Sequence, residues 1–153
     1  MEIRKVLFPT DFSATSVSAL ETAVEFSERF GAQLHPLYVL EDLPNVPVIS
    51  FEHLPSATPE EFYQVTEKLA RERLEKLLLE RVPGPVRGSV GLRRGHPSLE
   101  IVLAAETENF DLIVMSTHGR TGLKHALLGS VTEKVVRKAP CPVLTVRASE
   151  EER

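Results

Sequence analysis

The sequence predicts an α/β protein: a doubly wound, three-layer sandwich around a five-stranded parallel sheet. Three observations favour this fold class. Short apolar runs alternate along the chain with longer segments whose apolar residues recur at helical spacing. Glycine and proline separate many of these segments. Polar residues follow several of the expected strands directly, where open parallel sheets bind ligands. Alternation of this kind implies right-handed crossovers, with helices covering both faces of the sheet.

The first three elements are expected to be a strand, a helix and a second strand. The apolar run at residues 6–8 ends at Pro9-Thr10-Asp11 and forms the first strand. Apolar residues then recur at helical spacing from Ser13 to about Gly31, which predicts a helix. Residues 33–40 predict the second strand. Pro36 removes one ladder donor from it and indicates weak pairing at that point.

A long loop and a long helix should follow. Residues 41–57 are rich in proline and have no sustained period, and such loops in compact domains are usually functional or mobile. Thr58-Pro59-Glu60-Glu61 combines an N-cap threonine, a proline at the first helical position and a glutamate three residues after the cap. A helix is therefore predicted from Thr58 to about Arg81. Its solvent-facing side should be charged, and its apolar side should contain Phe62, Val65, Leu69 and Leu77.

The second half of the chain repeats the alternation. Pro83-Gly84-Pro85 ends the long helix, and residues 86–92 alternate as a third strand. Gly95-His96-Pro97 should turn into a helix that places Leu99, Val102, Leu103 and Glu106 on one side. A strand at 112–115, a helix from about Ser130 to Lys138 and a strand at 143–146 complete the pattern. We expect a single domain over 1–148 and a charged tail over 149–153.

Composition narrows the function classes. The chain has 153 residues, of which 42% are hydrophobic, enough for one domain with a substantial core. Its formal charge of −4 gives no general reason to bind nucleic acid or an anionic membrane. No apolar run approaches a membrane span, and the N-terminus does not resemble a signal peptide. The single Cys141 excludes an internal disulfide, so we expect a cytoplasmic protein.

A glycine-bearing segment, residues 116–122, connects the strand at 112–115 toward the helix start at Gly129-Ser130. Glycine lets the backbone approach a ligand closely, and the N–H groups of a helix start favour an anion. The arrangement predicts a site for a phosphorylated small molecule. Two alternatives stay open. Ser130 and Glu133 have capping-box spacing and could serve only their helix, and Asp11 could either cap a helix or bind ribose hydroxyls or a phosphate-bound metal.

Other chemistry-bearing residues have more ordinary interpretations. His118 could donate to a phosphate or be incidental to its loop. His35 and His96 lack neighbours at metal-ligand spacing and are interpreted as structural. Cys141, between two prolines, is expected to be a packed residue and no nucleophile. No metal cage is predicted.

The pattern Ser116-x-x-Gly119-x9-Gly129-Ser130 closely resembles the universal stress protein family, whose ATP-binding members carry Gly-x-x-Gly-x9-Gly-Ser/Thr. The strands before and after this pattern and the segment 6–13 extend the resemblance over nearly the whole chain, apart from the proline-rich loop. It implies the adenine nucleotide alpha hydrolase-like, Rossmann-like form of the fold. One residue departs from the pattern, because Ser116 replaces the first motif glycine. Serine is small, so we expect binding to survive, and its hydroxyl could add a hydrogen bond.

The resemblance also implies which residues bind ATP. Those that match Pro9, Thr10 and Asp11 lie along the adenine and ribose in ATP-binding relatives. The residue matching Val39 gives backbone hydrogen bonds to the adenine edge, and Met115 and Ser116 match residues that line the ribose. A divalent cation, Mg²⁺ or Mn²⁺, is expected to be held mainly by the phosphates. The positions expected around the triphosphate are His118, Gly119, Arg120, Gly129, Ser130, Val131 and Thr132.

A regulatory role is favoured over an enzymatic one. The chain lacks both the P-loop pattern and the dinucleotide pattern Gly-x-Gly-x-x-Gly. No element orients a base toward a nucleophile. The leading hypothesis is a stress-response protein that couples adenine nucleotide occupancy to its conformation or to an unknown protein client. The resemblance implies a homodimer, for which the strand at 143–146 is a plausible edge. Two alternatives remain: a dimeric interaction module of the same fold without nucleotide, and a weak ATPase.

Overall fold

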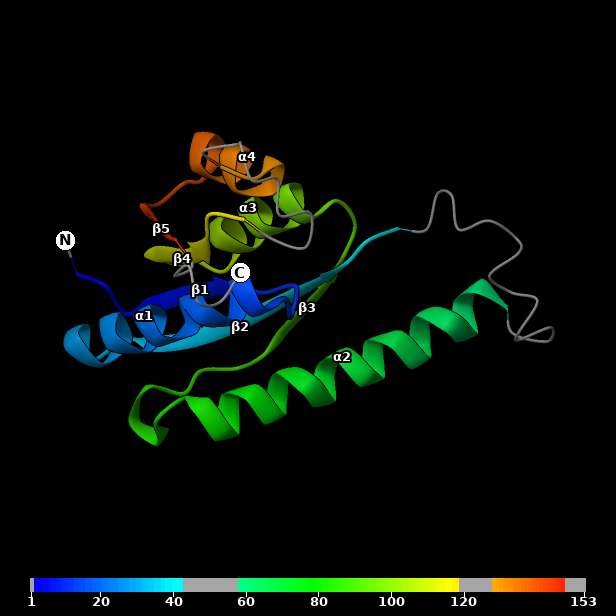
Figure 1. Ribbon diagram of the computed structural model, residues 1–153, viewed down its shortest axis with the longest axis horizontal. Helices are drawn as coiled ribbons and strands as arrows, with labels where there is room; N and C mark the ends of the chain where they lie inside the picture. The colour runs from blue at the N-terminus through cyan, green and yellow to red at the C-terminus, as the bar shows by residue number, and fades with distance from the viewer. Residues whose placement is uncertain (1, 43–57, 119–127, 148–153) are drawn as a thin grey trace.

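The computed structural model of the chain describes residues 2–42, 58–118 and 128–147. In these residues five parallel strands form one sheet in the order β3-β2-β1-β4-β5, and four helices alternate with them (Figure 1). The predicted fold class is confirmed. The strands are β1 (Lys5–Pro9), β2 (Gln33–Leu40), β3 (Gly91–Arg94), β4 (Leu112–Ser116) and β5 (Val143–Val146), and the helices are α1 (Ala14–Phe30), α2 (Pro59–Arg81), α3 (Pro97–Thr107) and α4 (Ser130–Lys138).

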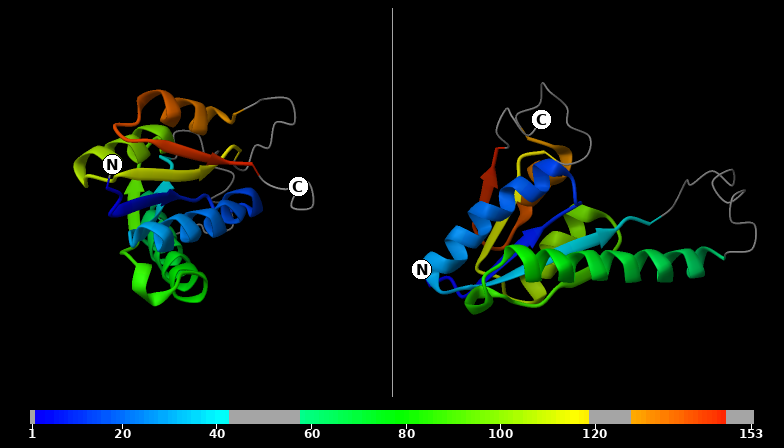
Figure 2. Two further views of the ribbon diagram at one scale, coloured as in Figure 1. Left: turned by 90° about the vertical axis from the view of Figure 1, so that its left-hand side faces the viewer. Right: turned by 60° about the horizontal axis from the view of Figure 1, so that its bottom comes forward.

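The helices lie in two layers, with α1 and α2 on one face of the sheet and α3 and α4 on the other (Figure 2). Side chains along β1 alternate between the two cores: Val6 and Phe8 pack under α1, while Leu7 packs on the side of α3. The central strands β1 and β4 are buried on both faces, as all-apolar strands of a parallel sheet must be. Within the described residues, no helix combines the length and apolar character that crossing a bilayer requires.

The third strand begins later than the alternation at 86–92 predicts. A short 3₁₀ turn occupies Gly84–Val86, and β3 starts only at Gly91. In the stretch before β3, Gly88 lies close to the His35 imidazole ring, because a Cβ there would lie 2.6 Å from it. Between the isolated bridge from Leu34 to Arg87 and the first β2–β3 pair at Gly91 lies Pro36, whose missing donor predicted weak pairing here.

Two helices bury a different side from the one that the spacing of large apolar residues suggests. In α2, Val65 and Leu69 are each 59% exposed, while Ala70, Leu74 and Leu78 face the sheet. In α3, Leu99 and Leu103 are exposed, and the buried positions are Ser98, Ile101, Ala104 and Ala105. Leu77, predicted on the apolar side of α2, does pack against the core on its side of the sheet, so the buried face of α2 is rotated from the predicted one and is not opposite to it.

His35 on β2 is the buried polar group with an incomplete set of partners. Its Nδ1 accepts a hydrogen bond from the backbone N–H of Ser89 at 3.1 Å, so the neutral ring carries its proton on Nε2. Within the described residues, that buried Nε2 has no hydrogen-bond partner. Burial, with a smaller contribution from the charge of Lys5, lowers the pKa of His35, while the backbone hydrogen bond of Ser89 and the charge of Glu108 oppose this change.

The lowered pKa predicts acid sensitivity. Folding disfavours protonation of the His35 ring, whereas the unfolded chain binds this proton below about pH 6.5, so the free energy of unfolding should fall as the pH drops below about 6.5. His35→Gln should flatten this part of the profile, because glutamine does not titrate. Urea titrations at successive pH values measure the slope. The exposed His96→Gln is the matched control, and a wild-type profile already flat over this interval would contradict the prediction.

The corrected face of α2 predicts unequal effects of two leucines. Leu74→Ala should lower the free energy of unfolding by about 2–5 kcal/mol, because it leaves a cavity in the core under α2. Leu69→Ala should change it by less than about 0.5 kcal/mol, since that side chain is largely exposed. Denaturant unfolding of both variants compares them directly. Equal losses would mean that the face containing Leu69 is also covered.

Candidate functional site

The candidate site lies where the strand order reverses, between β1 and β4. These two strands have registered pairs only at Val6–Leu112 and Leu7–Ile113. Both then continue beyond this pairing, β1 to Pro9 and β4 to Ser116. The carboxyl ends of the two strands are therefore unpaired with each other, at the edge where open α/β sheets bind their ligands.

The end of β1 is held by a network of short hydrogen bonds. The buried Thr10 donates its N–H to the Leu37 carbonyl at 2.9 Å, and its hydroxyl lies 2.9 Å from that of Ser16. Asp11 accepts hydrogen bonds from both the N–H and the hydroxyl of Ser13. Ser13, in turn, is the N-cap of α1 and accepts from the Ser16 N–H. The cap of α1 is therefore Ser13, and Asp11, two residues before it, orients the cap without capping the helix itself.

Val39 lies on β2 just beyond the last β1–β2 pair. That pair joins Pro9 to Leu37, and the Leu37 carbonyl accepts the N–H of Thr10. Backbone groups alternate sides along a strand, so the N–H and carbonyl of Val39 also face the β1 side, two residues past the end of the pairing. The backbone of Val39 therefore faces the same edge of the sheet as the end of β1.

The end of β4 is tied to the start of α4. Met115 and Ser116 are both buried, and the Ser116 hydroxyl donates to the His118 carbonyl at 2.6 Å. Thr132 donates its hydroxyl to the Ser116 carbonyl at 2.9 Å, and the Gly129 N–H donates to the Thr117 carbonyl at 2.7 Å. These bonds hold the two ends of the glycine-containing segment together. Gly119 and Arg120, both expected at the phosphates, lie outside the described residues.

The start of α4 differs from the capping-box interpretation. Gly129 is the N-cap, and Ser130 is the first helical residue, exposed and one position too late to cap. Glu133 instead pairs with Arg137 along the helix. Within the described residues no side chain caps α4, so its first-turn N–H groups, including those of Val131 and Thr132, have no side-chain acceptor at the helix start, which is tied to the end of β4. This arrangement favours an anion.

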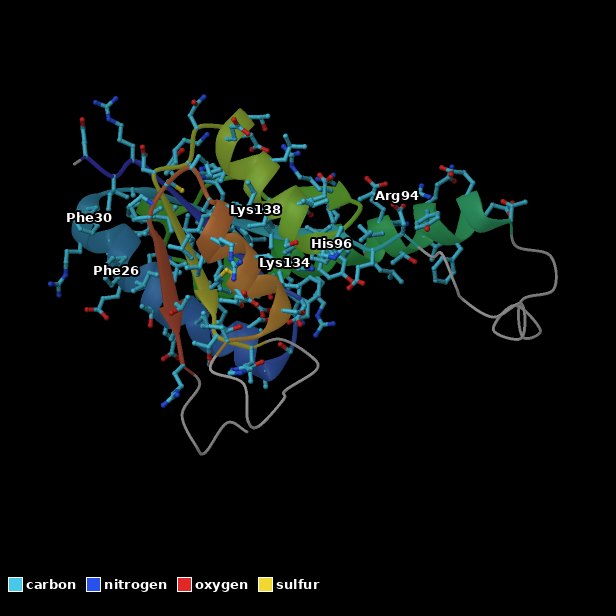
Figure 3. All side chains as sticks on the ribbon, turned by 90° about the horizontal axis from the view of Figure 1, so that it is seen from above. Phe26, Phe30, Arg94, His96, Lys134 and Lys138 are labelled. Atoms are coloured by element: carbon cyan, nitrogen blue, oxygen red, sulfur yellow. The ribbon has the colours of Figure 1, made fainter. Side chains whose placement is uncertain are left out.

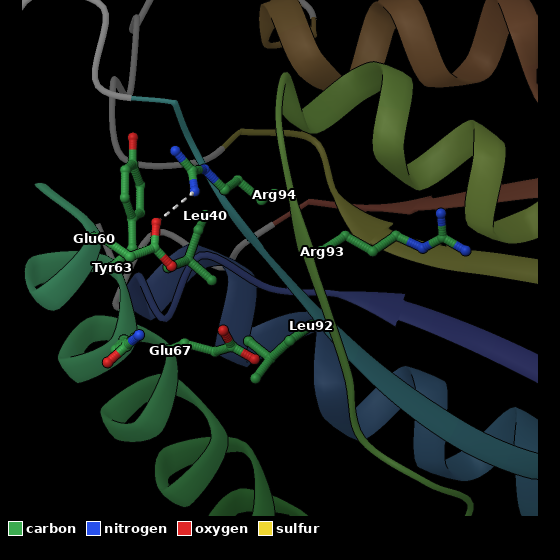
Figure 4. A pocket seen from close by; sticks show the side chains of 8 residues that line it. Leu40, Glu60, Tyr63, Glu67, Leu92, Arg93 and Arg94 are labelled. Atoms are coloured by element: carbon green, nitrogen blue, oxygen red, sulfur yellow. Dashed lines mark ion pairs between the residues drawn. The ribbon is translucent and has the colours of Figure 1, made fainter.

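Asp42, which follows β2, is directed away from the crevice. Its carboxylate accepts from Arg94 at 2.9 Å, and Arg94 also stacks over the Tyr63 ring at 3.4 Å and pairs with Glu60 at 4.0 Å (Figure 4). Arg94, Tyr63 and Glu60 border a shallow groove of about 140 Å³ between α2 and the edge of the sheet. Both arginines that line the groove are paired with two carboxylates each, Arg94 with Asp42 and Glu60 and Arg93 with Glu100 and Glu108, which disfavours a phosphate there. The edge where β1 and β4 separate is therefore bordered by side chains from the ends of these two strands and by backbone from β2.

His96 and Cys141, both interpreted from the sequence as structural residues, have local contacts of that kind. His96 is the N-cap of α3, with its Nδ1 3.1 Å from the hydroxyl of Ser98. Burial raises the pKa of the Cys141 thiol, which makes it a poor nucleophile at neutral pH. Among the residues that the structure describes, no three His, Cys, Asp or Glu side chains come together as a metal site.

The sequence pattern gave no role to Phe12, although this residue lies between Asp11 and Ser13, which were both singled out. Phe12 adopts a positive φ of 60°, which is rare for an aromatic residue. Its ring stacks on Tyr38 of β2, and Arg73 of α2 lies over it. No local sequence pattern predicts this conformation, because the residues that contact the Phe12 ring lie far along the chain.

Comparisons with known proteins agree with this architecture. Residues 2–147 match the model of the universal stress protein family. The universal stress protein MJ0531 of Methanocaldococcus jannaschii is 35% identical over 150 residues, which cover 97% of this chain and 85% of that protein. The solved structure of MJ0577, a universal stress protein of the same organism, has a TM-score of 0.80 at 32% identity and covers 98% of this chain and 99% of its own.

A more distant structure shares the fold. A universal stress protein family member from Arabidopsis thaliana, solved with AMP bound, has a TM-score of 0.65 at 19% identity. It covers 97% of this chain and 94% of its own. With the family model matching almost all of the residues, and with a 35% identical relative aligned along nearly the full chain, the chain belongs to the universal stress protein family.

Proposed function

We propose that this protein binds an adenine nucleotide, with ATP as the leading ligand, in the crevice between β1 and β4 and acts as a nucleotide-dependent regulator. The observation that carries the proposal is the convergence at one edge of three different binding groups. These are the carboxylate after β1, the outward backbone of β2 and the start of α4, which lacks a side-chain cap. A ribose, a purine edge and a phosphate chain require these three kinds of group in that order.

The assignment of each part of the nucleotide follows from the chemistry of each group. Asp11 offers carboxylate oxygens near the turn, suited to ribose hydroxyls. The backbone at Val39 presents a donor and an acceptor that suit the adenine edge. The AMP-bound relative of the same fold supports a nucleotide of this class.

The phosphates are assigned to α4 and the segment before it. Ser130, Val131 and Thr132 supply first-turn N–H groups, and the chain at His118, two residues after β4, is assigned to the same phosphates. Gly119 and Arg120 complete the set through the family motif. A divalent cation, Mg²⁺ or Mn²⁺, would be held mainly by the phosphates, because the described residues provide no three-ligand protein site.

Occupancy would act as a signal. The bonds from Thr132 to Ser116 and from Gly129 to Thr117 connect the start of α4 to the end of β4, so a nucleotide that draws on α4 also affects this junction. We place this signalling in the cytoplasm and assign its readout to a protein client of unknown identity. Slow hydrolysis of ATP is the catalytic alternative.

Asp11→Ala tests the proposal. Wild-type protein should bind ATP and AMP in isothermal titration calorimetry and gain thermal stability with millimolar MgATP. The variant should bind about 10- to 100-fold more weakly, because hydrogen bonds to a charged group contribute about 1.5–3 kcal/mol. Asp42→Ala, which removes a carboxylate already paired with Arg94, is the matched control.

Mass spectrometry of the natively purified protein complements the titration. Co-purified adenine nucleotide would support the proposal. If no nucleotide is bound and MgATP produces neither heat nor a thermal shift, the protein is an interaction module without nucleotide. Turnover that survives Asp11→Ala would indicate a contaminating ATPase.

We further propose that the protein forms a homodimer through β5, an edge strand of the described sheet. The carbonyls of Pro142 and Val146 accept from Ile113 and Thr117 on the β4 side. By strand alternation, the backbone groups of Val143 and Thr145 face the open edge, where an antiparallel partner strand can pair with them.

This geometry predicts a selective effect of proline. Thr145→Pro should convert the dimer to a monomer, because it removes an outward N–H without breaking a bond to β4. Thr145→Val, which keeps the N–H, should stay dimeric. Light scattering after size-exclusion chromatography gives both masses, and circular dichroism verifies the fold. A dimer that survives the proline would place the interface elsewhere.

A further inference from the structure

Phe12 holds a backbone conformation that its own side chain disfavours. Its φ of 60° lies in the left-handed region, and the other non-glycine residue with positive φ in the described part of the chain is Asn109. Asparagine tolerates this region because its short polar side chain can bond locally, whereas a bulky aromatic residue does so only when its surroundings enforce it. The turn after β1 therefore depends on contacts made elsewhere.

Those contacts come from two other elements. The Phe12 ring stacks on Tyr38 of β2, with centroids 4.9 Å apart and planes inclined by 26°. On the same ring, the Arg73 guanidinium of α2 lies 4.3 Å from the centroid, within cation–π range. The Phe12 N–H also donates to the Thr10 hydroxyl at 3.0 Å. The conformation of Phe12 is thus fixed by its neighbour Thr10 and by two residues far along the chain, Tyr38 and Arg73.

The conformation of Phe12 determines the direction of the Asp11 carboxylate. Asp11 and Ser13 flank Phe12 and are joined across it by two hydrogen bonds to one carboxylate oxygen. Rotation of Phe12 to a negative φ would reorient Ser13 relative to Asp11 and separate these groups. The contacts of the Phe12 ring consequently support the local geometry at the end of β1.

We propose that Arg73, Phe12 and Tyr38 are positioning residues that hold Asp11 for the nucleotide ribose, so that α2 tunes nucleotide affinity from outside the crevice. This inference rests on the proposed function for the ribose contact, but the stack itself exists without ligand. Arg73 is exposed and lies in the middle of α2, so its loss should leave the core intact.

The test is a double-mutant cycle measured by calorimetry with AMP. Arg73→Ala should weaken AMP binding about two- to fivefold, the loss expected for one exposed cation–π contact. In the Asp11→Ala background the same substitution should have no further effect, because the carboxylate through which Arg73 affects the ligand has been removed. Arg73→Lys, which keeps the cation, should recover part of the affinity.

Two control variants separate positioning from general loss of structure. Arg71→Ala lies on the same helix and removes an exposed arginine whose ion pair is with Glu67 at 4.0 Å, so it should not change affinity. Phe30→Ala removes a partly exposed aromatic side chain on the opposite side of the molecule from Arg94 (Figure 3) and should not change it either. Phe12→Ala should weaken binding more than Arg73→Ala does, and Phe12→Tyr should restore it.

A readout without ligand keeps this inference distinct from the proposed function. The three-bond HN–Hα coupling and ¹³C shifts of Phe12 should report a left-handed residue in the wild type and a shift away from it in Arg73→Ala. If AMP fails to bind the wild type while these signals change as expected, the proposed function fails and the stack stands. Unchanged Phe12 signals, or an equal affinity loss in both Asp11 backgrounds, would overturn the positioning role.

Discussion

The double burial of β1 is the constraint on which the rest of the structure depends. This strand is paired with β2 on one side and β4 on the other, and its side chains enter both cores. No polar group can lie along its length without a partner, because the cost of burying it would be large. Polar chemistry is therefore confined to the point where the strand stops, and Thr10 and Asp11 stand there.

The same constraint explains how the site is assembled. Since β1 and β4 separate after two registered pairs, the binding edge needs other connections to keep its shape. The Thr132 hydroxyl supplies one of them at the Ser116 carbonyl, and the Thr10 hydroxyl supplies another at Ser16. Both threonines are buried, and their hydroxyls hold the neighbouring segments of the candidate site in place. Ser116, the departure from the family motif, uses its hydroxyl in the same way, on the carbonyl of His118.

The fold was predictable from local signals, and the fine placement was not. Alternating apolar runs, the Thr58 capping box and the glycine at the end of α1 gave the element order and most boundaries. The predicted face of α2 was rotated from the buried one, because Ala70 packs inward while Leu69 points out, and burial depends on how closely a helix approaches the sheet. At the start of α4, the cap is Gly129 and not Ser130, and residue spacing alone does not place a helix start to within one residue. The role of Phe12 depends on contacts across more than 60 residues, which no local pattern carries.

The interruption of pairing at Pro36 has a consequence for how the molecule opens. Between the bridge at Leu34 and the ladder that begins at Leu37, β2 has no registered partner on its β3 side, and this gap lies toward the start of the strands. Amide protons are exchanged first where backbone bonding is sparse, so local opening should begin there. The opposite edge, where Asp11 and Ser116 lie, can remain ordered while that end opens. Proline in β2 thus places this unpaired stretch on the β3 side, toward the start of the strands and away from Asp11 and Ser116.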